Sequence, residues 1–465
     1  MVPEFDPGSF KDPEGRVFAH RGGIYRTLSQ AAATRMRRLQ DDGTLADLEA
    51  RGWLIASRVA DAATEGLSTA SVGDSVMRHD RIETQTYPFE WSFDMLRDAA
   101  LVTLDLIAHG LGRSLILKDS TAYNLAFHDG RMVFFDTLSI EPYEDGAPWD
   151  GYAQFCREFL FPLLLTSYRG VEFHPLVRGT LSGLPVRQFA RLMGIRDTVR
   201  PGVLKHVVLQ AKLERSFKDT DAEMRSSFQT MKFSGAMIAA NVAGLRKLIS
   251  GLSYSAGDSI WGDYAASHSY NASDEAVKRE FVSAAVDRLA PGQLIDLGGN
   301  IGDYSLLVAD RVARVLCVDI DPACVNTLYR RVREGGVTNV VPIVGDLLNP
   351  SPALGWNLTE RRDLFTRVRS DAFLALALVH HLCIGGNIPL VQVVEALHRI
   401  APSGVVEWVD KEDAMVRRML RNRPDVFSDY TWETFRAELS RWFTVAETAE
   451  THGGARRLCL LLPKG

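Results

Sequence analysis

Three polar runs between residues 294 and 347 have the residue types and spacing needed to hold a nucleoside-like ligand. The first, residues 294–303, is a glycine-rich turn between an expected strand and an expected helix. Glycine there lets the backbone turn tightly and approach a ligand closely. The second run places Asp319 at the tip of the next expected strand, where a carboxylate can accept hydrogen bonds from both ribose hydroxyls. The third, residues 345–347, follows one strand later, where a side chain can contact an adenine ring.

Regular alternation of strands and helices after about residue 261 predicts the elements that position these runs. Short apolar segments bounded by turns predict strands, and the amphipathic segments between them predict helices. Such alternation is typical of a mainly parallel sheet with helices on both faces, so the expected fold class is α/β and Rossmann-like. The expected strands are 294–297, 314–320, 339–346, 371–379 and 404–409, followed by an antiparallel pair at 443–450 and 456–463.

The motifs DLGGNIG, VDID and GDL, at these spacings, resemble the first three motifs of class I S-adenosyl-L-methionine-dependent methyltransferases. The resemblance covers about residues 261–465 and implies a seven-stranded methyltransferase sheet that binds S-adenosyl-L-methionine. It implies that Asp319 holds the ribose and Asp346 faces the adenine amine, although Gly299 and Asn300 stand where another small residue is usual. A Rossmann sheet that binds a different nucleotide is the alternative. The implied cofactor residues are Asp296, Gly298 and Gly302, which line the methionine part, together with Gly299, Asn300, Asp319, Ile320, Asp346 and Leu347.

Two adjacent histidines, His380 and His381, follow the fourth expected strand, whose carboxyl end faces the transferred methyl group in this fold. Methyl transfer from a sulfonium is an in-line displacement with a neutral leaving group, so it needs alignment and no metal. A hydroxyl or amine acceptor must also lose a proton, and an ordinary histidine pKa suits that task at neutral pH. His381 is therefore the first candidate for a base or orienting group. In the alternative, one histidine caps the strand and the other packs in the core.

Two further segments carry candidates for the acceptor side. Residues 349–363 form an expected insertion in which Trp356 and Arg361 could contact an acceptor bearing a carboxylate or phosphate. Glu407 and Lys411 follow the fifth expected strand on the same edge. A solvated loop and a helix N-terminus are the respective alternatives. Asn357, Arg362, Trp408 and Asp410 are further candidates in these segments, and Trp261, Tyr264 and Tyr270 could close over the sulfonium or form a packing lid.

The N-terminal half predicts a different architecture, an α+β and mostly helical domain. Residues 93–111 have the apolar spacing of a helix, and segments 124–127 and 132–136 predict a hairpin around the turn at 128–130. Residues 150–250 are expected to be mostly helical. The predicted organisation is an N-terminal domain at 1–249, a linker at 250–260 and the methyltransferase domain at 261–465.

Asp119, Asn124 and Asp136 have the spacing of the catalytic and metal-binding loops of protein-kinase-like folds, and residues 90–170 resemble that family. The pattern departs from the family in three ways. Asp136 is followed by Thr-Leu-Ser and not by Phe-Gly. Lys118 replaces the usual His or Gly, and no glycine-rich loop or strand-borne lysine is evident upstream. We therefore expect a degenerate kinase-like domain used for binding or docking. An active phosphotransferase and an unrelated fold are the alternatives.

The segments YPFEWSFDMLRDAAL, LKDSTAYNLAF and ALVHHL resemble a bacterial group of two-part methyltransferase proteins, some related to a nodulation protein. The expected activity is methyl transfer to O or N of a small-molecule or glycan acceptor. A protein or peptide methyltransferase whose N-terminal domain docks the acceptor, and a non-catalytic cofactor-binding scaffold, are the alternatives.

Composition limits the partners and the location of the chain. The net charge is −5 with no long run of one sign, which argues against a nucleic-acid binder. The N-terminus lacks a signal-peptide pattern, and no apolar run reaches the roughly 18 residues of a membrane span. The five cysteines form no CxxC pair, so they are expected to be reduced core residues of a cytoplasmic protein without a metal site.

Overall fold

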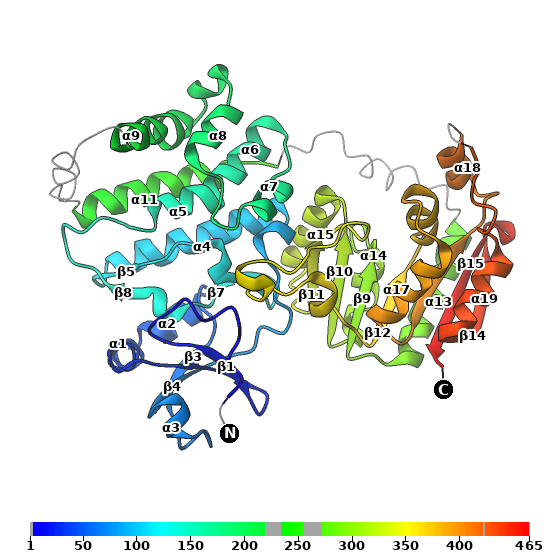
Figure 1. The fold of residues 1–465 in the computed structure, drawn as a ribbon, viewed down its shortest axis with the longest axis horizontal. Helices are drawn as coiled ribbons and strands as arrows, with labels where there is room; N and C mark the ends of the chain where they lie inside the picture. The colour runs from blue at the N-terminus through cyan, green and yellow to red at the C-terminus, as the bar shows by residue number, and fades with distance from the viewer. Residues whose placement is uncertain (1–2, 219–233, 255–271, 422–423, 465) are drawn as a thin grey trace. The chain divides into compact units, whose positions relative to one another are not determined.

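The computed structural model describes residues 3–218, 234–254, 272–421 and 424–464. These residues form two compact units (Figure 1). The first unit comprises Met1–Gly257 together with Ala353–Arg361, and the second comprises Asp258–Pro352 and Arg362–Gly465. The predicted linker lies partly outside the described residues.

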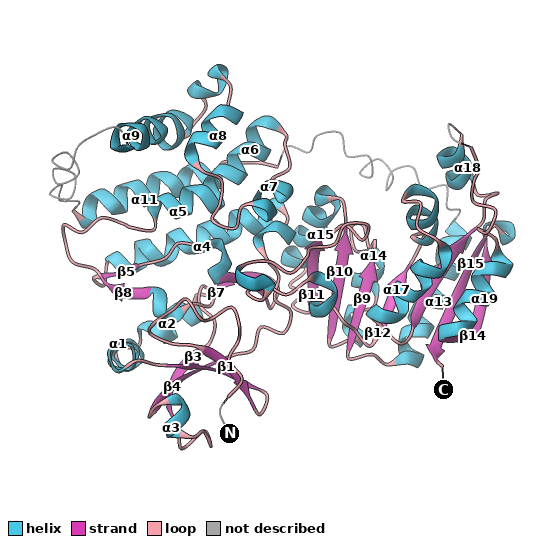
Figure 2. Cartoon of the chain, viewed as in Figure 1, coloured by secondary structure: helices cyan, strands magenta, loops and turns pink. Residues whose placement is uncertain are grey.

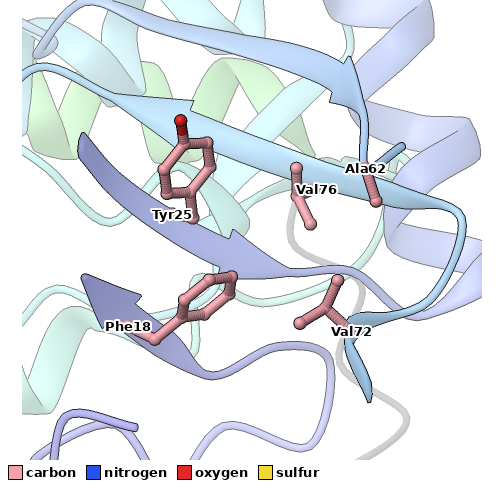
Figure 3. Packing of buried hydrophobic residues seen from close by; sticks show 5 residues of the cluster. All are labelled: Phe18, Tyr25, Ala62, Val72 and Val76. Atoms are coloured by element: carbon pink, nitrogen blue, oxygen red, sulfur yellow. The ribbon is translucent and has the colours of Figure 1, made fainter. Parts of the chain in front are cut away.

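The first unit begins with a four-stranded antiparallel sheet whose core is small and apolar. The side chains of Phe18, Tyr25, Ala62, Val72 and Val76 pack together over its face (Figure 3). The strands are β1 (Val17–His20), β2 (Gly23–Thr27), β3 (Ser57–Asp61) and β4 (Ser75–His79), in the order β1-β2-β4-β3, with helices α1 (Gln30–Asp41), α2 (Thr44–Ala50) and α3 (Thr69–Val72).

Helix α4 (Phe93–Leu111) has the bounds that the sequence predicted. It begins there because the Ser92 hydroxyl accepts a hydrogen bond from the Met95 backbone N–H, a typical N-cap. The predicted hairpin also forms, since Asp129 and Gly130 both adopt positive φ at its turn. Its strands are β6 (Leu125–His128) and β7 (Arg131–Phe134), and a second antiparallel pair joins β5 (Leu115–Leu117) to β8 (Ile140–Pro142).

The rest of the first unit is mostly helical, as predicted. Helices α11 and α6 both pack on α4 (Figure 2). The bounds of the helices are α5 (Tyr152–Phe155), a π-helical turn at Cys156–Leu160, α6 (Phe161–Arg169), α7 (His174–Gly179), α8 (Val186–Leu192), α9 (Leu209–Lys218) and α11 (Gly235–Ser250).

The second unit is built on a seven-stranded sheet in the order β11-β10-β9-β12-β13-β15-β14. The first five of these strands are parallel, and β15 runs antiparallel to both of its neighbours. The strands are β9 (Gln293–Leu297), β10 (Arg314–Asp319), β11 (Val340–Val344), β12 (Ala372–Ala375), β13 (Gly404–Val409), β14 (Phe443–Thr451) and β15 (Arg456–Pro463). The helices are α13 (Ala272–Leu289), α14 (Asp303–Leu307), α15 (Pro322–Glu334), α16 (Leu364–Arg367), α17 (Leu390–Ile400), α18 (Ala414–Leu420) and α19 (Trp432–Trp442).

The chain reverses direction across this sheet between β9 and β12. From β9 it proceeds outward through β10 to β11, and it then returns to the other side of β9. In open parallel sheets, ligands bind outside the carboxyl ends of the strands at such a reversal point. The glycine-rich turn lies at the carboxyl end of β9.

The prediction of a strand over residues 371–379 is wrong for the second half of that segment. Strand β12 ends at Ala375, Ala377 adopts a φ of +48°, and the chain enters a helical turn that continues as a π-helical turn at His381–Gly385. A short, continuous apolar run fits a buried strand and a buried helix equally well, which is why its period could not reveal the boundary. Among the described residues, no helix has the length and apolar character that crossing a bilayer requires.

Candidate functional site

The glycine-rich turn after β9 needs glycine for two different reasons. Gly302 has a φ of +78°, a left-handed conformation that favours glycine, as the residue just before α14. Gly299 is enclosed instead: a Cβ atom there would lie 2.3 Å from the Cys317 sulfur and 2.9 Å from an Asp296 carboxylate oxygen. The backbone therefore passes closer to the neighbouring strand than any side chain would permit.

Asp319 joins this turn to the end of β10. Its Oδ2 accepts a hydrogen bond of 2.7 Å from the Asn300 backbone N–H, and its Oδ1 accepts one of 2.8 Å from the Asp321 backbone N–H. A carboxylate has about four acceptor positions, so each oxygen retains capacity for one more donor. Burial raises the pKa of Asp319, against the effect of these backbone bonds. The glycine-rich turn and the Asp319 carboxylate are thus joined by a direct hydrogen bond.

Asp296 lies beneath the turn and is buried. Its Oδ2 accepts a hydrogen bond of 2.7 Å from the Ser305 hydroxyl on α14. Burial raises the pKa of Asp296 to about 6. These contacts tie the floor of the turn to the following helix.

Two exposed apolar side chains stand at neighbouring strand ends. Ile320 directly follows β10 and is 52% exposed, and Leu348 lies shortly after β11 and is 48% exposed. Between them in sequence, Asp346 accepts a hydrogen bond of 2.8 Å from the Leu348 backbone N–H, and Leu347 is half-buried. Exposed apolar side chains at a strand edge suit a flat ring such as adenine. Leu348 was not predicted, because a single leucine in a loop gives no signal in the sequence.

The segment after β12 is irregular and lies against the glycine turn. A Cβ atom on Gly298 would lie 3.3 Å from the Leu378 side chain, two residues before His380. Both Ala377 and Asn300 are non-glycine residues with positive φ. Such strained residues, like π-helical turns, occur preferentially at functional sites.

His380 and His381 stack on each other, with ring centroids 4.1 Å apart. His380 is fully buried, and neither of its ring nitrogens has a hydrogen-bond partner in the described part of the chain. Burial and the nearby Arg456 lower the pKa of His381 to about 4, and burial lowers the pKa of His380 well below its usual value. The expectation of an ordinary histidine pKa here is therefore wrong, because water has been removed from around both rings. Both imidazoles are neutral at pH 7.

A buried chain of charged groups crosses β13 beside these histidines. The Lys278 ammonium on α13 lies 2.7 Å from Glu407, and both side chains are almost completely buried. The Arg456 guanidinium lies 2.8 Å from Asp413 and 3.8 Å from the other Glu407 oxygen. Sequence reasoning named Glu407 but missed the two cations. Lys278 falls on the apolar face of α13 with Phe281, Val282 and Ala285, and a lysine at that spacing was the available signal.

The other predicted acceptor residues have local partners. The Lys411 ammonium donates to both Asp425 carboxylate oxygens and to the Phe427 carbonyl. Trp408 is buried and stacks on Tyr430, and Asp410 accepts a hydrogen bond from the Glu412 backbone N–H. Trp261, Tyr264 and Tyr270 lie outside the described residues.

Residues Ala353–Arg361 of the insertion belong to the first unit, whereas the two histidines belong to the second. Trp356 is 72% exposed, and Asn357 adopts positive φ beside it. The Arg361 guanidinium lies 3.9 Å from the centre of the Tyr123 ring and is hydrogen-bonded to Glu360. Arg362 is assigned to the second unit. Trp356 and Arg361 are thus assigned to a different compact unit from His381.

Of the three motif residues of the first unit, Asp136 is a buried carboxylate and Asn124 is hydrogen-bonded to it. Asp136 Oδ1 is hydrogen-bonded and ion-paired to Arg26 of β2, while its Oδ2 accepts from the Asn124 side-chain amide at 3.1 Å and from the Ser139 hydroxyl at 2.5 Å. Burial and the Asp136 charge raise the pKa of Asp119. Lys118 lies 3.3 Å from Glu14. Across the described ranges, no cluster of three or more His, Cys, Asp or Glu side chains is arranged to hold a metal ion.

No family profile matches the chain. The chain is 38% identical over 461 residues to nodulation protein NoeA of Rhizobium meliloti (strain 1021), covering 97% of this chain and 94% of that protein. Similar solved structures include the N-methyltransferase NodS from Bradyrhizobium japonicum WM9, at 13% identity and a TM-score of 0.31, covering 42% of this chain and 99% of that one. Magnesium protoporphyrin IX methyltransferase from Synechocystis PCC 6803 matches at 15% identity and a TM-score of 0.32, covering 44% and 93%.

Proposed function

This chain belongs to the family of nodulation protein NoeA, and from that premise we propose that it is an S-adenosyl-L-methionine-dependent methyltransferase. The proposed acceptor is the oxygen or nitrogen of a small molecule or glycan. The observation that carries the proposal is the hydrogen bond from the Asn300 backbone N–H to the Asp319 carboxylate. The carboxylate keeps further acceptor positions next to a turn whose backbone, at Gly299, packs closely on Cys317. The strand order also supports the proposed function, because the antiparallel strand β15 lies between β13 and β14 near one end of the sheet.

The residues fit the proposed cofactor part by part. Asp319 has room for two ribose hydroxyl donors, and Ile320 and Leu348 offer apolar surface for the adenine ring. The turn at Gly298 and Gly299 would hold the methionine part through its backbone. When bound, S-adenosyl-L-methionine supplies an electrophilic methyl group on a positively charged sulfur. The tasks of the chain are to align the acceptor with that methyl group, to exclude water and to receive a proton.

Isothermal titration with S-adenosyl-L-methionine and with its demethylated product tests the proposal. Wild type should bind both ligands. Asp319→Ala should bind about 10- to 100-fold more weakly, because it loses hydrogen bonds to a charged acceptor worth about 1.5–3 kcal/mol. Asp310→Ala, which removes a carboxylate that is 79% exposed in the same unit, is the matched control and should bind like wild type. If wild type gives no heat, the proposal is wrong.

The proposed role of the first unit, predicted as residues 1–249, is to dock the acceptor as a degenerate kinase-like domain. Phosphoryl transfer in kinase-like folds needs an aspartate free to hold magnesium. Here three donors, from Arg26, Asn124 and Ser139, already occupy the two Asp136 oxygens. ATP with magnesium should therefore raise the melting temperature of the protein by no more than ATP-free magnesium does. A large shift that disappears in Asp136→Asn would overturn this assignment.

A further inference from the structure

We infer that residues 186–213 of the first unit form a surface that binds the face of an anionic lipid bilayer. This inference goes beyond the proposed methyl transfer and does not depend on it. The segment comprises helix α8, a short helical turn at Ile195–Val199, a π-helical turn at Leu204–Val208 and the first half of α9. Helices α8 and α9 lie together at the end of the first unit opposite its four-stranded sheet (Figure 1).

The apolar side chains of this segment are unusually exposed. Ile195 and Val199 are 93% and 89% exposed, more than any other large apolar side chain of the described residues. Single exposed apolar side chains are common on protein surfaces, whereas a group of them marks an interaction site. The segment carries six exposed large apolar side chains: Leu192, Ile195, Val199, Leu204, Leu209 and Leu213.

The turn that carries Ile195 and Val199 is held in place from within. Between these two residues, the Asp197 side chain is almost completely buried. One of its carboxylate oxygens accepts a hydrogen bond of 2.7 Å from the Gly194 backbone N–H, and the other lies 3.2 Å from the Arg200 guanidinium. Because the turn is already ordered, its two aliphatic side chains lose little conformational entropy when they meet a partner.

Positive charge accompanies the exposed apolar side chains. The segment contains one acidic residue, Asp197, and that carboxylate is already ion-paired with Arg169 and Arg200. Glu214, which directly follows the segment, pairs with Arg157. The whole chain has a net charge of −5, so the segment is opposite in sign to the rest of the molecule. Its basic residues are Arg187, Arg191, Arg196, Arg200, Lys205 and Lys212.

An anionic bilayer is the partner that matches both the apolar side chains and the charge. Aliphatic side chains enter the boundary between head groups and acyl chains, while Lys and Arg are attracted to anionic head groups. A nucleic acid would be held by basic residues together with aromatic rings that stack on its bases, but the exposed large apolar side chains of this segment are all aliphatic. A second copy of the chain would bring like charges face to face. The segment therefore lies on the bilayer surface and does not cross it.

Co-sedimentation of the full chain with lipid vesicles tests the inference. Wild type should sediment with vesicles of equimolar phosphatidylcholine and phosphatidylglycerol and remain in solution with vesicles of phosphatidylcholine alone. Ile195→Ser/Val199→Ser should weaken binding by about tenfold or more, because it removes the two most exposed aliphatic side chains from the contact. Arg191→Gln/Arg196→Gln should weaken it about fivefold for each charge removed, and added salt should weaken it too.

A fluorescent label shows which surface touches the bilayer. All five native cysteines are buried, so a thiol introduced at the surface can be labelled selectively. A polarity-sensitive fluorophore on Ile195→Cys should shift its emission to shorter wavelength when the anionic vesicles are added. The same fluorophore on Val426→Cys should not shift. Val426 is 70% exposed in the second unit, so Val426→Ser is also the matched control for sedimentation and should bind vesicles like wild type.

Several results would overturn the inference. Wild type that stays in solution with both kinds of vesicle, or that binds both equally, removes the anionic bilayer as the partner. Unchanged sedimentation of Ile195→Ser/Val199→Ser, or an unshifted label on Ile195→Cys, places the contact elsewhere. Self-association in analytical ultracentrifugation, or binding of a labelled DNA duplex, that this double variant loses while no vesicle binds would assign the surface to a second copy or to nucleic acid. Cofactor titration is a separate measurement, so none of these results bears on the proposed methyl transfer.

Discussion

Replacing Asp136 by alanine should destabilise the first unit strongly, because it removes the nearer carboxylate partner of the buried Arg26 guanidinium. Arg26 and Asp136 are 8% and 9% exposed and form an ion pair. After the substitution, the nearest remaining carboxylate is that of Asp12, at 3.7 Å from Arg26. Breaking a buried pair from one side costs about 3–5 kcal/mol. With a slope of about 2–3 kcal/mol per molar urea, the midpoint of unfolding should fall by about 1–2 M.

The assay must separate the two units, since one transition cannot be assumed for both. Hydrogen exchange measured along a urea titration does so, with peptides from α4 reporting on the first unit and peptides from β9 on the second. In Asp136→Ala, only the α4 peptides should lose protection from exchange at a lower urea concentration than in wild type. The exposed Glu83→Ala change, which removes a surface ion pair with Arg81, is the control and should cost less than about 1 kcal/mol.

The sign of the pH dependence of the first unit's stability follows from the pKa of Asp136. Burial raises this pKa, but Arg26 and the Ser139 hydroxyl lower it by more, so that it lies below its ordinary value. A depressed carboxyl pKa contributes stability that is present above the unfolded pKa of about 4 and is lost as pH falls through the folded pKa. The difference in the free energy of unfolding between wild type and Asp136→Ala should therefore become smaller below pH 4. A difference that does not change with pH, or one under about 1 kcal/mol at pH 7, would contradict this role of Asp136.

Two further predictions concern the cofactor turn. Gly299→Ala should cost about 1–3 kcal/mol in the second unit and weaken S-adenosyl-L-methionine binding, since its Cβ would meet the Cys317 sulfur at 2.3 Å; thermal unfolding and calorimetry check this, and wild-type behaviour would contradict it. Asp296 has a raised pKa of about 6, so its folded form takes up a proton and gains stability as pH falls from 7 toward 4. In Asp296→Asn, the stability of the second unit should no longer rise as pH falls from 7 toward 4. A pH dependence of stability equal to that of wild type would contradict the raised pKa of Asp296.

The sequence predicted the parts of the fold that depend on local pattern. The bounds of α4 follow from its apolar spacing and from Ser92, and the hairpin turn follows from Asp129 and Gly130. The junction of Asp319 with the glycine turn was predictable because parallel strands leave a sheet at one edge.

What could not be predicted depends on contacts between distant segments. The early end of β12 at Ala375 is set by packing around an apolar run that fits either a strand or a helix. The depressed pKa of His381 requires knowing that Arg456, 75 positions later, lies beside it. The contact of Arg361 with Tyr123, both in the first unit, likewise cannot be predicted from the spacing of residues in the sequence.

Both units contain buried ion pairs, but at the sheet edge of the second unit buried polar groups also lack a partner among the described residues, and this difference bears on function. Burying ions rarely stabilises a protein more than apolar packing would, so the buried groups need another reason to exist. In the first unit, Asp136 is held by three donors from the protein, one of them the ion-paired Arg26 guanidinium, which suits a structural role. In the second, Asp319 keeps acceptor capacity and both His380 nitrogens have no partner in the described ranges. Unmet hydrogen-bonding capacity in a buried place is costly until a ligand satisfies it, and that cost is best explained if methyl transfer takes place at this edge of the second sheet.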